Sequence, residues 1–349
     1  MDDYYRHSKK MLRNLFLLTG VSPRHTPLLV LKLPHSGSTW LANSLSSLPN
    51  VYLVKEGLTK FSMSATPISE VERYLIRALR SPTGTFLAPS KLSLPRATVS
   101  AQSSRTTWNV VGCSVCPIIN AGTREGGNWS AVVKPRFKQA LRAVLAVVPR
   151  ARVIIYYRSN AVKQTLSSSS SSFTRHHDRR MLYIEPEILL GEARLWLQRG
   201  AMLQELRFSC GKASGVLVLA YEALQLDTTG ELMRSIATDF LQMPPADVVP
   251  AVSKGQFYRS TGGVKLASED LRERLQNFHA VSAHLEAFAP CLVEQLHSPS
   301  PRIFGPCRAE NITNGFLLAN HSSGGGIFGN AKRGATGGGL NEFLIAAAQ

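Results

Sequence analysis

Residues Leu28–Trp40 join a short apolar run to a small polar loop and then to the start of a helical segment. The run Leu28–Leu33 predicts a buried strand, because it is apolar apart from one lysine and is followed by a proline. The Ser-Gly-Ser-Thr sequence that follows predicts a tight turn, and Ser38–Leu48 predicts a helix. Backbone N–H groups converge in such a loop, and the helix dipole adds partial positive charge. The stretch therefore predicts a phosphate-binding loop.

Short apolar runs recur along the chain and alternate with segments of helical periodicity. The predicted strands are Leu28–Leu33, Val51–Val54, Trp108–Cys113, Arg152–Tyr157 and Gly215–Ala220. The predicted helices are Ser38–Leu48, Glu70–Leu79, Pro135–Val148, Glu185–Phe208, Leu232–Leu241 and Glu269–Phe288. This alternation indicates a parallel sheet that is covered on both faces. The predicted fold class is α/β: a P-loop-like three-layer α/β/α arrangement with a short central parallel sheet of about 4 to 5 strands.

The chain of 349 residues is long enough for one α/β domain with additions. We expect a basic N-terminal arm over residues 1–25, the α/β domain over residues 26–300, and a Gly/Ser-rich disordered tail over residues 301–349. No run of about 18 or more apolar residues occurs, so the sequence predicts no transmembrane helix. Ligands of parallel sheets bind at the carboxyl ends of strands, where both the loop after Leu33 and Arg158 are predicted to lie.

Basic residues outnumber acidic ones, and the formal net charge is +17. Between Lys134 and Arg180 there are eleven Lys or Arg residues and a single acid, Asp178. Such a concentration favours a polyanionic ligand, such as a nucleotide, a charged glycan, a nucleic acid or an anionic membrane. Of these, a specific nucleic-acid partner is not expected. The alternative is a basic protein whose surface charge has no specific partner.

The five cysteines do not form a disulfide scaffold, because their number is odd and their spacing is wide. Cys113 and Cys116 have the spacing of a zinc pair, but no second pair completes the site. Because they lie at the end of an apolar run, we expect buried structural thiols there. Cys291 and Cys307 are expected to pair if the protein is secretory.

The polar loop resembles a Walker A motif but lacks its lysine, since Ser38 follows Gly37. It is more similar to the 5′-phosphosulfate loop of the sulfotransferase family, which reads Pro-Lys-Ser-Gly-Thr-Thr-Trp in cytosolic members. Ser38 is a conservative change, whereas His35 stands where that family carries lysine or arginine. The matching positions are Pro34, Ser36, Gly37, Thr39 and Trp40.

The strand that ends before Arg158 resembles a second element of the same family. There an arginine and a helical serine hold the 3′-phosphate of 3′-phosphoadenosine 5′-phosphosulfate (PAPS), and a guanidinium is a rigid donor fork that suits phosphate. The resemblance assigns these roles to Arg158 and to Ser167, nine residues later, with Ser168 as the alternative serine. The alternative interpretation assigns this segment no function: Arg158 would be an exposed residue at a strand end, followed by a low-complexity serine linker.

Two weaker matches extend the resemblance to about residue 290. The segment Val216–Leu224 is similar to a family strand that ends in Tyr-Glu-Asp-Leu, and we expect Tyr221 and Glu222 to hydrogen-bond neighbouring loops. Arg259 to Lys265 is similar to the late loop that closes over the 3′-phosphate, where Gly262 and Gly263 permit close backbone approach. The resemblance therefore adds Arg259 and Lys265 to the cofactor-binding residues.

Sulfuryl transfer is an in-line displacement that needs a base facing the acceptor and cationic donors at the leaving group. The resemblance to the glycosaminoglycan branch makes Glu56 the base. His35 and Lys55 are the expected cations on the leaving side. Lys32 belongs to the strand, and we expect its side chain to point away from the loop. The resemblance implies PAPS as donor and PAP as product, and no metal.

These inferences predict a PAPS-dependent sulfotransferase that acts on a hydroxyl of a carbohydrate, because the basic segment suits an anionic glycan. One alternative is an inert sulfotransferase-like protein that binds a nucleotide or polyanion. A P-loop small-molecule kinase is a weaker alternative, since the Walker lysine is missing. The acceptor pocket would come from residues 58–105 and 173–200. A Golgi-lumenal protein, with a membrane anchor outside this sequence, and a cytoplasmic protein both remain open, as does the oligomeric state.

Overall fold

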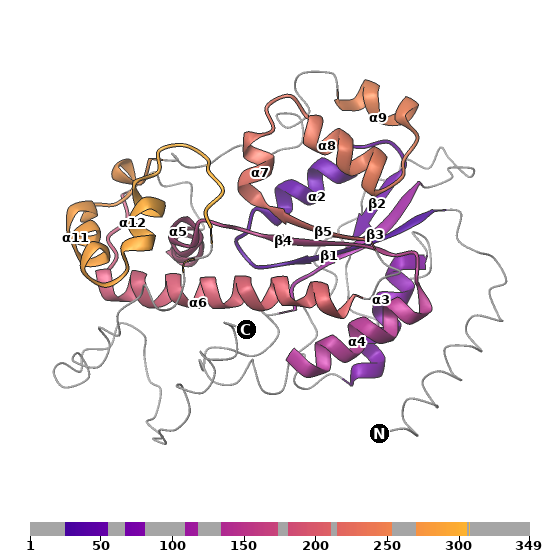
Figure 1. Cartoon of the computed structure of the whole chain (residues 1–349), viewed down its shortest axis with the longest axis horizontal. Coiled ribbons are helices and arrows are strands. Elements are labelled where there is room, and N and C mark those ends of the chain that lie inside the picture. Colours follow the sequence, from indigo (N-terminus) through magenta and orange to yellow (C-terminus); the bar gives the residue numbers. More distant parts are fainter. Residues whose placement is uncertain are drawn as a thin grey trace.

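The structure is a computed structural model of the whole chain (Figure 1). It describes residues 25–54, 67–80, 109–117, 134–173, 181–210, 215–252, 270–305 and 307, with the backbone alone at residues 134 and 169–173.

A five-stranded sheet forms the centre of the molecule. Its strand order is β2-β3-β1-β4-β5, and every neighbouring pair is parallel. The strands are β1 (Thr26–Lys32), β2 (Val51–Val54), β3 (Val110–Val115), β4 (Arg152–Tyr157) and β5 (Val216–Ala220). Because the described parts of these strands are largely buried, the uniformly apolar runs of the sequence are explained by burial on both faces.

Helices cover both faces of this sheet (Figure 1). The helices are α2 (Ser38–Ser46), α3 (Ile68–Arg80), α4 (Lys134–Val147), α5 (Ala161–Phe173), α6 (Pro186–Glu205), α7 (Tyr221–Leu226), α8 (Glu231–Ser235), α9 (Pro245–Val252), α11 (Phe278–Phe288) and α12 (Pro290–His297). One-turn 3₁₀ segments lie at Leu206–Ser209 and Leu271–Glu273, and a one-turn π segment lies at Ile236–Phe240. None of the described helices is both long and apolar enough to cross a bilayer.

The two faces of the sheet carry two separate apolar cores. One core joins the sheet to α3, α4, α5 and α6, and α11 and α12 extend it. The other core joins the opposite face to α2, α7, α8 and α9. Alternate residues of β1 divide between them, since Leu29 and Leu31 enter the first core while Leu28 and Val30 enter the second. This arrangement confirms the predicted three-layer α/β/α fold.

The last predicted helix, Glu269–Phe288, was wrong over its first half. The α-helix begins at Phe278, and Leu275 instead forms a bridge to Leu182. The backbone N–H of Leu182 donates to the carbonyl of Arg274 at 2.6 Å, and its carbonyl accepts from the N–H of Gln276 at 2.9 Å. A long-range backbone pairing therefore overrides the local helical preference, which periodicity alone does not reveal.

The cysteines follow the expected division between buried thiols and one pair. Cys113, Cys116 and Cys210 are buried and unbridged, and burial raises the pKa of Cys113 to about 12. A thiol with such a pKa is unreactive at neutral pH, as expected of a structural group. Cys291 and Cys307 form a disulfide with a Cα–Cα distance of 5.7 Å.

Candidate active site

The carboxyl ends of β1 and β4 border a topological switch point. The two strands are neighbours, but the helix after β1 (α2) lies on one face of the sheet and the helix after β4 (α5) lies on the other. Ligands of open parallel sheets bind in the crevice that such a divergence opens. The parallel pairing extends to the carboxyl ends of these strands. Lys32 of β1 pairs with Tyr156 of β4, and Tyr157 of β4 pairs with Ala220 of β5. The phosphate loop, Arg158 and Tyr221 therefore follow three adjacent strand ends.

The backbone of the phosphate loop adopts the conformation that an anion site requires. His35 (φ 55°) and Gly37 (φ 75°) are both left-handed, which turns successive N–H groups toward the same side. The buried Ser36 hydroxyl donates to the carbonyl of Leu33 at 2.6 Å and fixes the turn. Within the described part of the chain, no group accepts from the N–H groups of Gly37, Ser38 or Thr39. These donors at the α2 N-terminus suit a phosphate or sulfate group.

Gly37 is required by packing as well as by its dihedral angle. A Cβ at this position would lie 2.3 Å from ring carbons of Tyr221. The same ring meets the indole of Trp40 edge to face, with centroids 5.7 Å apart. Tyr221, the first residue after β5, therefore forms one wall of the loop. The sequence predicted a hydrogen bond from the Tyr221 hydroxyl to a neighbouring loop and did not predict this aromatic contact.

Lys32 does not point away from the loop, contrary to the expectation. Its Nζ donates to the hydroxyl of Ser38 at 2.9 Å, and its side chain is buried. The alternation of β1 explains the orientation, because Lys32 has the parity of Leu28 and Val30, which enter the core that contains α2. Strand parity could have predicted this, had the face covered by α2 been known.

Arg158 lies at the same crevice, one residue beyond the end of β4. Its guanidinium carbon is 4.9 Å from the centroid of the Tyr221 ring, whose edge abuts Gly37. Its side chain is 12% exposed, and its Nε lies 3.7 Å from Glu222 Oε1. Because the closest approach to this carboxylate uses Nε, Glu222 leaves the two terminal nitrogens available for an anion.

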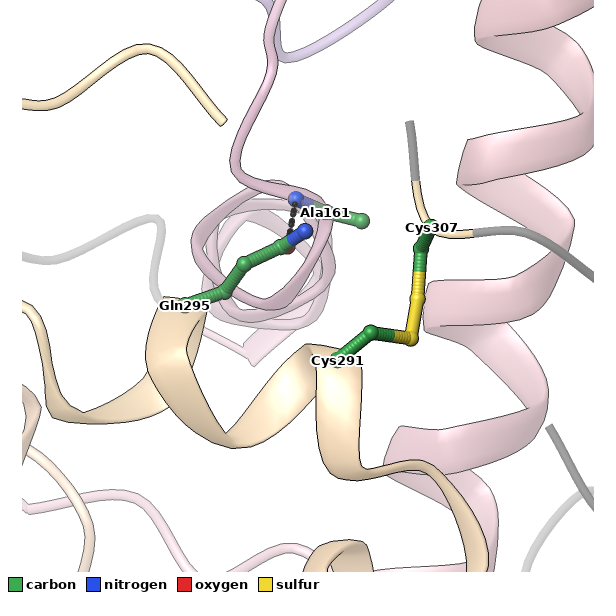
Figure 2. The surroundings of a disulfide bond; sticks show 4 residues. All are labelled: Ala161, Cys291, Gln295 and Cys307. Atoms are coloured by element: carbon green, nitrogen blue, oxygen red, sulfur yellow. Dashed lines mark hydrogen bonds between the residues drawn. A yellow bond between two sulfur atoms is a disulfide. The ribbon is translucent and has the colours of Figure 1, made fainter. Parts of the chain in front are cut away.

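The turn after Arg158 is held by residues far away in the sequence. Glu222 accepts from the N–H groups of Ser159 and Asn160 at 2.9 and 3.1 Å, which confirms the expectation that it hydrogen-bonds a neighbouring loop. Gln295 on α12 accepts from the N–H of Ala161 at 2.7 Å (Figure 2). Its backbone carbonyl accepts from the Asn160 side chain at 2.9 Å. The N–H groups of this turn and of the first residue of α5 are thus bonded by two distant segments.

Residues 298–305 and 307, which we call the C-terminal strap, add a third support to this turn. The N–H of Phe304 donates to the Ser159 hydroxyl at 3.1 Å, and Lys163 Nζ donates to the carbonyl of Ser298 at 3.1 Å. The disulfide between Cys291 on α12 and Cys307 closes the strap (Figure 2).

Helix α5 links the two predicted anion-binding elements. Gln164 Nε2 donates to the carbonyl of Pro34 at 2.9 Å. The half-buried residues Ser167 and Ser168 follow Gln164 by three and four positions, so both lie on the helix face that carries this contact. The whole serine run lies within helix α5, which continues through Phe173, so this run is not a linker.

His35 points toward helix α6. Its ring meets the Trp196 indole edge to face, with centroids 6.4 Å apart, and Arg199 lies over the same indole at 4.8 Å. Burial lowers the pKa of Arg199 from its ordinary value. No sequence motif marked Trp196 or Arg199, because neither follows a strand. Four predicted site residues lie outside the described residues: Lys55, Glu56, Arg259 and Lys265.

Comparison with known proteins agrees with this geometry. No curated protein sequence matches the chain. A model of the sulfotransferase family matches residues 27–245, which is more than half of the chain and contains the loop, Arg158 and Tyr221. The protein belongs to the sulfotransferase family.

Proposed function

We propose that this protein transfers the sulfuryl group of PAPS to an acceptor hydroxyl on a carbohydrate. One observation carries the proposal: two elements suited to anions, the loop Pro34–Trp40 and Arg158, both lie against the Tyr221 ring. PAPS has a phosphosulfate at its 5′ end and a phosphate at its 3′ end, so it requires two such elements in one crevice.

The residues of the crevice fit the donor. Open N–H groups at the α2 N-terminus would hold the phosphosulfate. Arg158, with Ser167 or Ser168, would hold the 3′-phosphate through charge-assisted hydrogen bonds. Thr39 contributes a hydroxyl on the first turn of α2, and Trp40 an aromatic face beside it. When bound, PAPS supplies a sulfuryl group on a phosphate leaving group, and the reaction needs no metal.

The acceptor side rests on the resemblance and on charge. Glu56 is proposed as the base that takes the hydroxyl proton, with Lys55 beside it. A carboxylate within hydrogen-bond reach of the hydroxyl would remove this proton as the O–S bond forms. The net charge of +17 favours an anionic glycan over a neutral one, because long-range attraction raises the encounter rate.

Calorimetric titration with PAP tests the cofactor site. We expect wild-type protein to bind PAP and to bind AMP, which lacks the 3′-phosphate, more weakly. Arg158→Ala should lower the affinity for PAP by about 10²-fold while leaving AMP binding nearly unchanged, because a charge-assisted bidentate contact is lost. Weak binding that ignores the substitution and fades with salt would contradict the proposal.

A second candidate function is an inert member of the family that binds a nucleotide or polyanion without turnover. The observation that favours it is His35, which replaces the basic residue of the family loop. Incubation with labelled PAPS and a panel of anionic and neutral glycans separates the two functions. Transfer that Glu56→Gln abolishes supports the enzyme, whereas PAP binding without transfer to any acceptor supports the inert protein.

A further inference from the structure

Arg199 on helix α6 is a half-buried cation that no carboxylate contacts in the part of the chain that the structure describes. Its guanidinium carbon lies 4.8 Å from the centroid of the Trp196 ring. Among the described residues, no hydrogen bond or ion pair engages this guanidinium. Burial lowers its pKa, and the charge of Glu192, two turns earlier, offsets only part of this effect. A cation that has lost part of its hydration and has no counter-ion in contact favours an anionic ligand.

Trp196 connects this cation to the phosphate loop. The indole is only 4% exposed and is packed in the first core, which fixes its orientation. Its ring meets His35 of the loop edge to face, with centroids 6.4 Å apart, and Arg199 lies over the same ring. A guanidinium that lies over an aromatic face keeps its N–H donors at its edge, where they suit a carboxylate or sulfate group.

Arg199 lies on the side of the loop away from Arg158. The thiol of Cys116, the residue after β3, contributes electrostatically to the pKa of Arg199, so the guanidinium is near the carboxyl end of that strand. The loop follows β1, which lies between β3 and β4 in the sheet, and Arg158 follows β4. Along the carboxyl edge of the sheet the order is therefore Arg158, the loop and Arg199.

We propose that Arg199 is a specificity residue that binds an anionic group, a carboxylate or a sulfate, of the acceptor glycan. This inference rests on the proposed function. There the 3′-phosphate of the donor is at Arg158 and the sulfuryl group is at the loop, and in-line transfer brings the acceptor to the side opposite the leaving oxygen. Arg199 lies beyond the loop as seen from Arg158, in the segment 173–200 from which the sequence predicts part of the acceptor pocket.

Calorimetric titration in the presence of PAP tests the site with three matched glycans. They are an unsulfated chondroitin oligosaccharide, which carries carboxylates only, its neutral carboxyl-reduced form, and the O-sulfated carboxyl-reduced form, which carries sulfates only. We expect wild type to bind at least one charged form more tightly than the neutral form. Arg199→Gln should lower the affinity for that charged form by about 10- to 100-fold, because a hydrogen bond between charged groups is lost. The affinities for the neutral form and for PAP should not change.

Two further variants separate a specific contact from general charge. Arg199→Lys keeps the charge but loses the planar fork, so its affinity for the charged glycan should fall between those of wild type and Arg199→Gln. Arg207→Gln is the matched control, because it removes the same charge from an exposed guanidinium that lies 4.6 Å from the centroid of the Phe208 ring. It should leave all the affinities unchanged. With a charged acceptor that is turned over, Arg199→Gln should raise KM and leave kcat unchanged, as expected when binding away from the reacting atoms is lost.

Equal losses in Arg199→Gln and Arg207→Gln would overturn the inference, because they would show a long-range effect of net charge. Equal losses for the charged and neutral glycans would also overturn it, because they would show that Arg199 only supports the fold. Wild type that binds PAP but binds no charged glycan more tightly than the neutral one would overturn the inference and leave the PAPS site intact. Wild type that does not bind PAP would contradict the proposed function itself.

Discussion

The two proposed anion-binding elements of the crevice, the loop Pro34–Trp40 and the turn after Arg158, are built in different ways. The phosphate loop is fixed largely by its own neighbours, since Ser36 bonds a carbonyl three residues away and Lys32 reaches a hydroxyl six residues away. The turn after Arg158 depends on residues that are 62 to 145 positions distant, among them Glu222, Gln295 and Phe304. One element is therefore a local structure, and the other exists only when the tertiary fold is complete.

This difference has an energetic consequence. A locally formed loop can lose an interaction without destabilising the whole domain, because few distant contacts depend on it. The Arg158 turn shares its hydrogen bonds with β5, α12 and the C-terminal strap, so a change there should reduce stability and PAP affinity together. Stability and affinity should accordingly be coupled at the Arg158 turn and separable at the loop.

The largest effect is expected for Glu222→Ala. The substitution leaves the N–H groups of Ser159 and Asn160 and the Arg158 guanidinium without their buried partner, which costs about 3–5 kcal/mol. We expect denaturant unfolding to show this loss of stability. Calorimetry should show that the substitution lowers the affinity for PAP more than the affinity for AMP. Glu231→Ala, which removes an exposed carboxylate that pairs with Arg234, is the matched control and should change neither quantity. Unchanged stability in Glu222→Ala would refute the coupling.

Loss of the disulfide is the next largest change. Serine at both Cys291 and Cys307 frees the strap, and a closed loop of about 15 residues contributes about 3 kcal/mol through chain entropy. The contact of Phe304 with Ser159 should weaken, so PAP affinity should fall by less than tenfold. Wild-type protein in reductant should reproduce both effects, and the double serine variant should not respond to reductant. Identical unfolding curves with and without reductant would show that the strap does not depend on the bridge.

Gly37→Ala tests the local element. The left-handed backbone costs an alanine about 1–2 kcal/mol, and the new Cβ would displace the Tyr221 ring that it meets at 2.3 Å. We expect PAP and AMP affinity to fall together by about 10- to 100-fold, because both ligands use the loop, while the free energy of unfolding falls by the backbone cost and by the cost of shifting the Tyr221 ring. Gly200→Ala on α6 meets no atom within 4 Å and should leave binding unchanged. A loss confined to PAP would argue against the loop as the 5′-phosphate site.

The same contrast explains what the sequence could predict. The strand, loop and helix of Leu28–Trp40 are encoded by adjacent residues, so local pattern predicted the structure, which is confirmed; the phosphate role of the loop stays a prediction. Arg158 was predictable because it follows an apolar strand. Gln295 and Phe304 carry no pattern, because their roles arise only when α12 and the strap pack onto the turn. Lys32 was misread, since its direction depends on which face of the sheet α2 covers.

The smallest effect is expected where the two elements meet. Gln164 on α5 donates to the carbonyl of Pro34 at 2.9 Å, which joins the Arg158 side of the crevice to the loop. Gln164→Ala removes one neutral hydrogen bond, so stability should fall by about 1 kcal/mol. A ligand that engages both elements depends on their relative position, whereas AMP engages the loop alone. PAP affinity should therefore fall a few-fold more than AMP affinity. Gln276→Ala deletes a similar bond to the carbonyl of Met181 at an exposed site and should change neither affinity. Equal losses for PAP and AMP in Gln164→Ala would mean that this bond supports only the loop, and that the spacing of the two elements is set by the sheet.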